Sequence, residues 1–278
     1  MKKRIDPLSL LLNLLVRMAA ILTILVILFL VGYILVKGVP NLTPSLFAWE
    51  YNSENVSFVP AFINTVIMTF LSLLLAAPIG IFSAVYLNEY ARRGNRLVKM
   101  IRMAAEVLAG IPSIVYGLFG MIFFVVTLNW GYSLLAGTFT LTIMILPLIM
   151  RTTEEALLSV PDAYREGSFG LGAGKLRTVF SIVLPAAIPG ILAGIILAIG
   201  RIVGETAALI FTAGTLAQIP NSLLDSTRTL SVHMYNLSSE GLYIDQAYAT
   251  AVILLVLVVL INACSGWLAK RMSGGYHG

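Results

Sequence analysis

The sequence predicts an all-α membrane protein with six transmembrane helices. Of its 278 residues, 59% belong to the apolar types AVILMFWYC and 11% are charged, whereas soluble domains have about 45–50% apolar and about 25% charged residues. The apolar residues form long runs, and the lysines and arginines lie between these runs with a marked bias to alternate loops. These observations exclude an ordinary soluble domain.

Six apolar runs are long enough to cross a bilayer. A helix rises about 1.5 Å per residue, so a hydrocarbon core of about 30 Å needs about 20 apolar residues. The predicted spans are 18–36, 58–87, 104–128, 133–150, 186–213 and 248–268. Lone strands leave backbone groups unsatisfied in lipid, so we expect a helical bundle.

The first span follows Lys2, Lys3 and Arg4, as the apolar part of a secretory signal does. It is longer than such a signal and has no small-residue cleavage site, so we interpret it as a retained signal anchor. The leucine-rich stretch 8–16 is interpreted as an interfacial helix that leads into this span.

Basic residues predict the orientation, because they are retained on the cytoplasmic side of a membrane. Only Lys37 and Arg228 lie in the opposite loops, and Arg201 falls within the fifth span. The other 15 of the 18 basic residues lie on one side: Lys2, Lys3, Arg4, Arg17, Arg92, Arg93, Arg96, Lys99, Arg102, Arg151, Arg165, Lys175, Arg177, Lys270 and Arg271. Both termini are therefore expected in the cytoplasm, and the net charge of +5 reflects topology rather than nucleic-acid binding.

The spans divide the chain into three parts. Residues 1–57 hold the N-terminal cytoplasmic segment, the first span and an external loop. Residues 58–272 form a core of five helices that includes a long cytoplasmic loop, 151–185, and residues 273–278 form a short tail.

The external segments 38–57 and 215–245 are too short for a domain, so recognition of a solute outside must come mostly from another chain. Their aromatic residues fit the role of interfacial anchors. They carry Trp49, Glu50, Tyr51, Glu54, Asp225, Arg228, His233 and Glu240.

The single cysteine, Cys264, excludes a disulfide framework, and two histidines cannot build a metal site without borrowed ligands.

The cytoplasmic loop 151–185 has the pattern of two short helices. Ser159 and Asp162 match a capping pattern with Pro161 in the first turn, and Gly170 and Gly172 predict a stop. A second helix is expected from Lys175 to the turn at Pro185. Such a module is a candidate docking element, and the alternative is a solvated loop.

No ATPase site is predicted in this chain. The run from Gly172 to Lys175 resembles a phosphate loop, but that motif needs glycine six positions before the lysine and Ser or Thr after it. Phe169 and Leu176 occupy these positions. Because hydrolase motifs are also missing from the sequence, we expect a transport subunit rather than an enzyme, with ATP hydrolysed by a partner.

The same loop resembles the EAA loop of type I ABC importer permeases. That motif reads E-A-A, three residues, G, nine residues, I, one residue, L-P, and here Gly167 and Ser168 replace the two alanines. The resemblance implies the MetI-like permease fold, and it implies that residues 58–272 are the type I transmembrane core. It also implies an ATPase-coupling helix that includes Asp162, Ala163, Tyr164, Glu166, Gly167, Ser168 and Gly172.

Two further stretches, 106–120 and 200–209, resemble permeases of phosphate importers, of the PstA type. The resemblance implies a subunit of an inorganic phosphate importer in a bacterial or archaeal cytoplasmic membrane. The implied partners are a second permease (PstC-like), an ATPase dimer (PstB-like) that binds ATP and Mg, and an external phosphate-binding protein (PstS-like). No cofactor is expected in this chain.

Three alternatives remain open. An importer of molybdate, sulfate or phosphonate would share the loop but not the G-R-x-x-G-E-T stretch. A secondary transporter or channel would show inverted repeats, and none is found. A membrane enzyme would need a catalytic constellation that the sequence lacks.

Arg201 and Glu205 are the charges expected within the fifth span. On a continuous helix they share a face with Gly190, Gly194, Ala198, Ala208 and Thr212. Such a face points to a bundle interior or a watery path. Either the two charges neutralise each other along the helix, or Arg201 offers its donors to a passing phosphate, as the resemblance implies.

Glu106, Ser113 and Tyr116 complete the predicted substrate pathway. Arg102 and Glu106 are spaced to pair along a helix, and the deeper Glu106 is a candidate for the inner gate. Pro78 and Pro112 interrupt helices, as hinges or as tolerated kinks. Glycines at 190, 194, 200 and 204 form two G-x-x-x-G pairs, which allow close helix approach.

Overall fold

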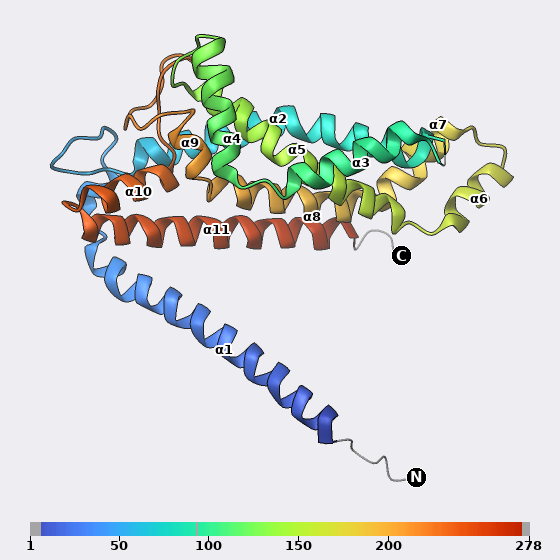
Figure 1. The fold of residues 1–278 in the computed structure, drawn as a ribbon, viewed down its shortest axis with the longest axis horizontal. Coiled ribbons are helices and arrows are strands. Elements are labelled where there is room, and N and C mark those ends of the chain that lie inside the picture. The colour runs from blue at the N-terminus through green and yellow to red at the C-terminus, as the bar shows by residue number, and fades with distance from the viewer. Residues whose placement is uncertain (1–6, 93, 274–278) are drawn as a thin grey trace.

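The computed structural model describes residues 7–92 and 94–273, and all regular structure in this part of the chain is helical (Figure 1). Lys2, Lys3, Arg4, Arg93 and the tail residues 274–278 lie outside the described residues. The α-helices are α1 Pro7–Gly38, α2 Val59–Val85, α3 Arg96–Ala109, α4 Ser113–Gly120, α5 Leu134–Leu158, α6 Asp162–Gly170, α7 Lys175–Thr178, α8 Leu184–Val203, α9 Ala207–Ile210, α10 Leu230–Glu240 and α11 Ile244–Ser273.

Five shorter helical turns extend or connect these helices. Two 3-10 turns, η1 Val39–Asn41 and η2 Pro44–Phe47, follow α1. Three π turns lie at helix ends: η3 Tyr86–Tyr90 extends α2, η4 Met121–Thr127 extends α4, and η5 Val179–Val183 joins α7 to α8.

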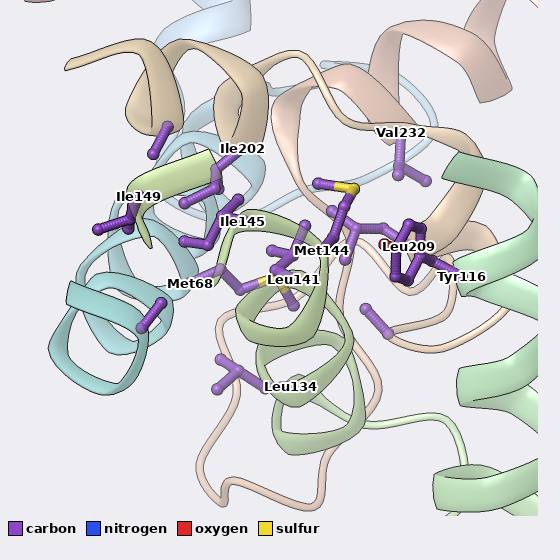
Figure 2. Close-up of a cluster of buried hydrophobic side chains, with 13 residues drawn as sticks. Met68, Tyr116, Leu134, Leu141, Met144, Ile145, Ile149, Ile202, Leu209 and Val232 are labelled. Atoms are coloured by element: carbon purple, nitrogen blue, oxygen red, sulfur yellow. The ribbon is translucent and has the colours of Figure 1, made fainter. Parts of the chain in front are cut away.

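Helix α5 forms the centre of the bundle, because α2 packs on it from one side and α8 from another. Ser133 caps its start by accepting a hydrogen bond from the Ala136 N–H. The core around it draws Met68 from α2, Leu141 and Ile145 from α5, and Ile202 from α8 (Figure 2). Burial of these apolar side chains holds the three helices together.

The first G-x-x-x-G pair brings α8 against α5. A Cβ atom at Gly190 would lie 2.6 Å from the Cβ of Ala156, and one at Gly194 would collide with the Thr152 hydroxyl. The second pair does not make such a contact within this chain, since nothing lies within 4 Å of a Cβ at Gly200. The prediction of close approach is therefore confirmed for the first pair only.

Helix α1 is continuous from Pro7 to Gly38, so the separate interfacial helix predicted over 8–16 is wrong. A Cβ at Gly38 would collide with the Tyr248 backbone, and Tyr33 packs edge-on against the Tyr248 ring. These contacts hold the end of α1 against α11, while the rest of α1 diverges from the bundle (Figure 1).

The predicted third span, 104–128, is not one straight helix. Helix α3 ends at Ala109, and the segment of α4 and η4 starts at Ser113 after a bend of 101°. The bend has a local cause, because Pro112 disfavours helical backbone at the residue before it. Among the residues that the structure describes, five helices are long and apolar enough to span a membrane, or six when this bent pair counts as one span.

The predicted fifth span, 186–213, is displaced toward the N-terminus. The helix already starts at Lys175 and ends at Val203, and the short α9 follows. The preceding loop is shorter than predicted, because α5 continues through 151–158. Figure 1 shows α6 and α7 at one end of the bundle and α10 at the other.

Candidate functional site

The predicted pathway residue Arg201 lies in the last turn of α8, where its charge meets the favourable negative end of the helix dipole. Its side chain is half-buried, and it forms no ion pair or hydrogen bond with the described residues. The guanidinium lies near enough to the Tyr116 phenol to interact with it electrostatically. Arg201 therefore keeps its hydrogen-bond donors available.

Glu205 does not pair with Arg201, so the alternative in which the two charges neutralise each other along one helix is wrong. The helix ends at Val203, and Glu205 lies in the break before α9. Its buried carboxylate accepts a hydrogen bond from the Ala208 N–H at 3.0 Å, and its carbonyl accepts one from the Ser231 hydroxyl. Glu205 thus caps the start of α9 and ties it to α10.

Tyr116 braces the bend between α3 and α4. Its buried phenol donates a hydrogen bond of 2.7 Å to the Leu108 carbonyl, near the end of α3. Ser113 is the first residue of α4 and is half-buried, and its hydroxyl forms no hydrogen bond with the described residues. Tyr116 thus has a structural role, which spacing alone did not indicate.

Glu106 is exposed on α3 and has no ion pair in the described residues. Arg102 pairs instead with Glu154 on α5 and donates a second hydrogen bond to the Leu87 carbonyl. The predicted pair of Arg102 with Glu106 is therefore wrong. The observed pair joins two helices rather than two turns of one helix.

The predicted docking module is present only in part. Helix α6 is separate, but α7 continues through η5 into α8, so the turn predicted at Pro185 is wrong, and the start of α6 also differs from the prediction. Helix α6 begins at Asp162, and no side chain caps it. Ser159 ends α5 instead and donates its hydroxyl proton to the Ala156 carbonyl. The capping pattern failed because the preceding helix continues up to this serine.

Gly172 ends α6 as predicted. Its φ of +82° is in the left-handed region, which favours glycine. The Gly172 N–H bonds to the Phe169 carbonyl and the Ala173 N–H bonds to the Ser168 carbonyl, which together form a Schellman motif. The motif glycine thus has a defined backbone function.

Ser168, which replaces an alanine of the EAA motif, holds α6 against α7. Its buried hydroxyl lies 2.8 Å from the Thr178 hydroxyl. The remaining predicted coupling residues form an exposed face of α6: Asp162, Ala163, Tyr164, Glu166 and Gly167. Leu171, which follows α6, is 91% exposed, so this face presents apolar as well as charged groups.

Arg165 connects α6 to other parts of the protein, whereas its sequence context indicated only a basic residue on the cytoplasmic side. It forms an ion pair with Glu89 and donates to the carbonyls of Leu157 and Val160. It also reaches Asp162 at 3.2 Å. Glu89 is distant in sequence, so only the fold could reveal this connection between α6, the end of α5 and the turn η3.

The chain belongs to the family described as the binding-protein-dependent transport system inner membrane component, which matches residues 76–274. It is 34% identical over 277 residues to the probable ABC transporter permease protein YqgI of Bacillus subtilis (strain 168), covering 91% of this chain and 92% of that protein. It is also 34% identical over 243 residues to the phosphate transport system permease protein PstA 2 of Mycobacterium bovis (strain ATCC BAA-935 / AF2122/97), covering 84% and 80%.

The fold is similar to that of a chain in the MetNI methionine ABC transporter, solved in inward-facing conformations. The TM-score is 0.60 at 21% identity, and the match covers 87% of this chain and 97% of that chain. The predicted MetI-like permease fold is therefore confirmed. The protein is a multi-pass membrane permease subunit of an ABC importer.

Proposed function

We propose that this permease forms half of the translocation pathway of an ATP-driven importer of inorganic phosphate. The observation that carries the proposal is the half-buried, unpaired Arg201 at the point where α8 breaks. A guanidinium in such a place can donate two parallel hydrogen bonds to a phosphate. The 34% identity to a phosphate permease supports the choice of oxyanion.

The proposed partners are a second, PstC-like permease, a PstB-like ATPase dimer and an external PstS-like phosphate-binding protein. ATP and Mg would be bound by the ATPase, and this chain would contribute no catalytic site of its own. The exposed face of α6 would dock on the ATPase, because its mixed apolar and charged side chains suit a protein interface. Closure of the ATPase dimer would then move α6 and rock the two permeases.

In this arrangement α6, α7 and both termini face the cytoplasm, and α10 lies at the external end. Cysteine labelling tests this orientation in a Cys264→Ser background, which removes the only native cysteine. A membrane-impermeant maleimide should label Glu54→Cys in intact cells and Asp162→Cys only after permeabilisation. The reverse result would overturn the orientation.

The transport test uses ATP-dependent uptake of radiolabelled phosphate into proteoliposomes that hold the full complex. Arg201→Gln should abolish uptake while the complex assembles and ATP hydrolysis continues. Arg151→Gln is the control, because Arg151 pairs on the exposed surface with Glu155. Unchanged uptake by Arg201→Gln would remove Arg201 from the pathway.

An importer of another oxyanion is the second candidate. Competition separates the two, because unlabelled phosphate should block uptake while sulfate, molybdate and phosphonates should not. If the native complex takes up no phosphate but transports one of these anions, the substrate assignment is wrong and the permease assignment stands.

A further inference from the structure

A second cluster of unpaired polar groups lies at the end of the bundle opposite α6, near α10 (Figure 1). We call Tyr51, Asn64, Arg228 and His233 the outer cluster. Asn64 comes from α2, His233 from α10, Arg228 from the residues just before α10, and Tyr51 from the segment before α2. None of these residues belongs to the Arg201 site or to the coupling helix.

Arg228 is 5% exposed and has no carboxylate partner among the described residues. Its Nη1 donates one long hydrogen bond, 3.4 Å, to the Thr215 carbonyl, and its Nε and Nη2 have no partner. The Tyr51 ring covers the guanidinium at 4.7 Å. A buried arginine with a purely structural role normally has a carboxylate partner and hydrogen bonds for its N–H groups. Arg228 has no carboxylate partner and only one long hydrogen bond among the described residues.

His233 is fully buried beside it, and neither ring nitrogen forms a hydrogen bond of ordinary geometry with a described group. Its ring lies edge-on to Tyr51 with the centroids 5.9 Å apart. Burial, and then the charge of Arg228, lower the pKa of His233 to about 3, while a weak hydrogen bond to the Val56 backbone has a smaller, opposite effect. The ring is therefore neutral near pH 7, with one nitrogen as donor and the other as acceptor.

Asn64 adds an acceptor to the cluster. Its Nδ2 donates to the carbonyls of Gln218 and Arg228 at 2.9 and 3.2 Å. These bonds fix the orientation of the amide, and its Oδ1 is left buried without a partner. The outer cluster thus offers unused donors on Arg228 and His233 and unused acceptors on His233 and Asn64.

This combination selects for one class of ligand. A fully deprotonated oxyanion such as sulfate has only acceptor oxygens, so it would leave the Asn64 and His233 acceptors unpaired. A partly protonated tetrahedral oxyanion presents both negative oxygens and an O–H donor. We infer that the outer cluster binds a partly protonated tetrahedral oxyanion, hydrogen phosphate, as an entry subsite on the external side of the permease.

A polar pocket adjoins the outer cluster and provides a route to it. Its volume is about 440 Å³, and its lining includes Trp49, Glu50, Tyr51, Gln218 and Asn221. Tyr51 and Gln218 contact both the pocket and the outer cluster. Rotation of the half-buried Tyr51 ring would expose the guanidinium to the pocket. Glu50 is exposed there, so solvent and salt screen its repulsion of an anion.

The test is thermal unfolding of the full complex without its external binding protein, with inorganic phosphate or sulfate added at equal ionic strength. Phosphate should raise the unfolding temperature of the native complex by about 2 °C or more, because a ligand that binds the folded state stabilises it. Sulfate should give a clearly smaller shift. Arg228→Met should lose most of the phosphate-dependent shift, and the surface control Arg151→Gln should keep it.

Arg228→Lys is the second variant, because it keeps the charge and removes the fork of donors; its phosphate shift should be smaller than that of the native complex. An undiminished shift in both Arg228 variants would overturn the subsite and assign the stabilisation to another phosphate site, in this chain at Arg201 or in another subunit. An equal shift with sulfate would overturn the selection for a protonated ligand. The entry role rests on the proposed phosphate import, whereas this binding assay does not involve uptake, so the two can fail separately.

Discussion

The Nη2 of Arg165 lies 2.7 Å from the Oε1 of Glu89, a residue 76 positions earlier in the chain. The Arg165 and Glu89 side chains are only 15% and 8% exposed. This pair connects α6 with the turn that extends α2. Arg165 also donates to the Leu157 carbonyl at the end of α5, so this one side chain links α6 to both α2 and α5. Movement of α6 would reach the membrane helices through these contacts.

Loss of this ion pair should lower the free energy of unfolding and reduce the coupling of ATP hydrolysis to transport. Arg165→Gln leaves the Glu89 carboxylate buried without a cation, which costs about 3–5 kcal/mol in typical buried pairs. Denaturant titration should show the loss, and phosphate uptake per ATP hydrolysed should fall. The control, Arg151→Gln, breaks a pair whose side chains are 56% and 65% exposed, and should cost under about 1 kcal/mol. Equal losses in both variants would contradict the structural role.

Gly172 and Gly170 offer a matched comparison at the end of α6. Gly172→Ala places a Cβ on left-handed backbone, which costs about 1–2 kcal/mol. Gly170→Ala should be neutral or slightly stabilising, because Gly170 is helical and nothing lies within 4 Å of its Cβ position. Thermal unfolding of both variants checks the difference, and the opposite order would exclude the Schellman motif.

Close contact between α4 and α9 predicts a strong effect at Gly117. An added Cβ would lie 2.8 Å from the Cα of Ala208, where backbone cannot yield easily. Gly117→Ala should destabilise the protein by about 1–3 kcal/mol, as overpacking does. Gly200→Ala, with open space at its Cβ, serves as the control in the same unfolding measurement. Similar stabilities for the two variants would refute this contact.

The pairing of Arg102 with Glu154 can be tested by exchanging charges. Arg102→Glu alone should impair assembly, because it places two carboxylates together between α3 and α5. Adding Glu154→Arg should restore assembly, measured as the yield of monodisperse complex. Adding Glu106→Arg should not restore it, and rescue by that variant would favour the pair expected along α3.

His233 predicts a pH dependence. Its pKa in the folded state is about 3, below the usual 6.5, so the unfolded chain binds the proton more readily. Stability should therefore be full above pH 6.5 and should fall as the pH decreases toward 3, by about 2 kcal/mol between pH 7 and 5. Unfolding titrations at these pH values should show a smaller decline in His233→Gln. An identical decline would mean that other groups cause it.

Hydropathy and loop charge predicted the helical class and the position of most spans, because both depend on local composition. They could not predict where a long helix breaks. The alternative in which Arg201 pairs with Glu205 assumed a continuous helix, but the helix ends at Val203 and Glu205 caps α9. Beyond this end, which falls before Gly204, α9 packs closely against α4, and no spacing within the fifth span reveals that contact.

Motif spacing predicted the position and the end of α6, but it did not predict which residues α6 contacts in the folded protein. Gly172 ended the helix as expected, whereas Ser159 acted on the helix before it. Arg165 and Glu89 carried no local signal, because residues far apart in sequence become partners only when α2 and α6 meet. The outer cluster likewise required the fold to bring Asn64 and Arg228 together.

Helix α1 also determines how the protein fits its bilayer. Its 32 residues extend about 48 Å, well beyond a hydrocarbon thickness of about 30 Å. A helix that is longer than the hydrocarbon core fits by tilting, and α1 runs oblique to the rest of the bundle in Figure 1. A thinner membrane would demand a steeper tilt and pull at the junction of Gly38 with Tyr248, so lipid thickness itself would become a variable of permease assembly.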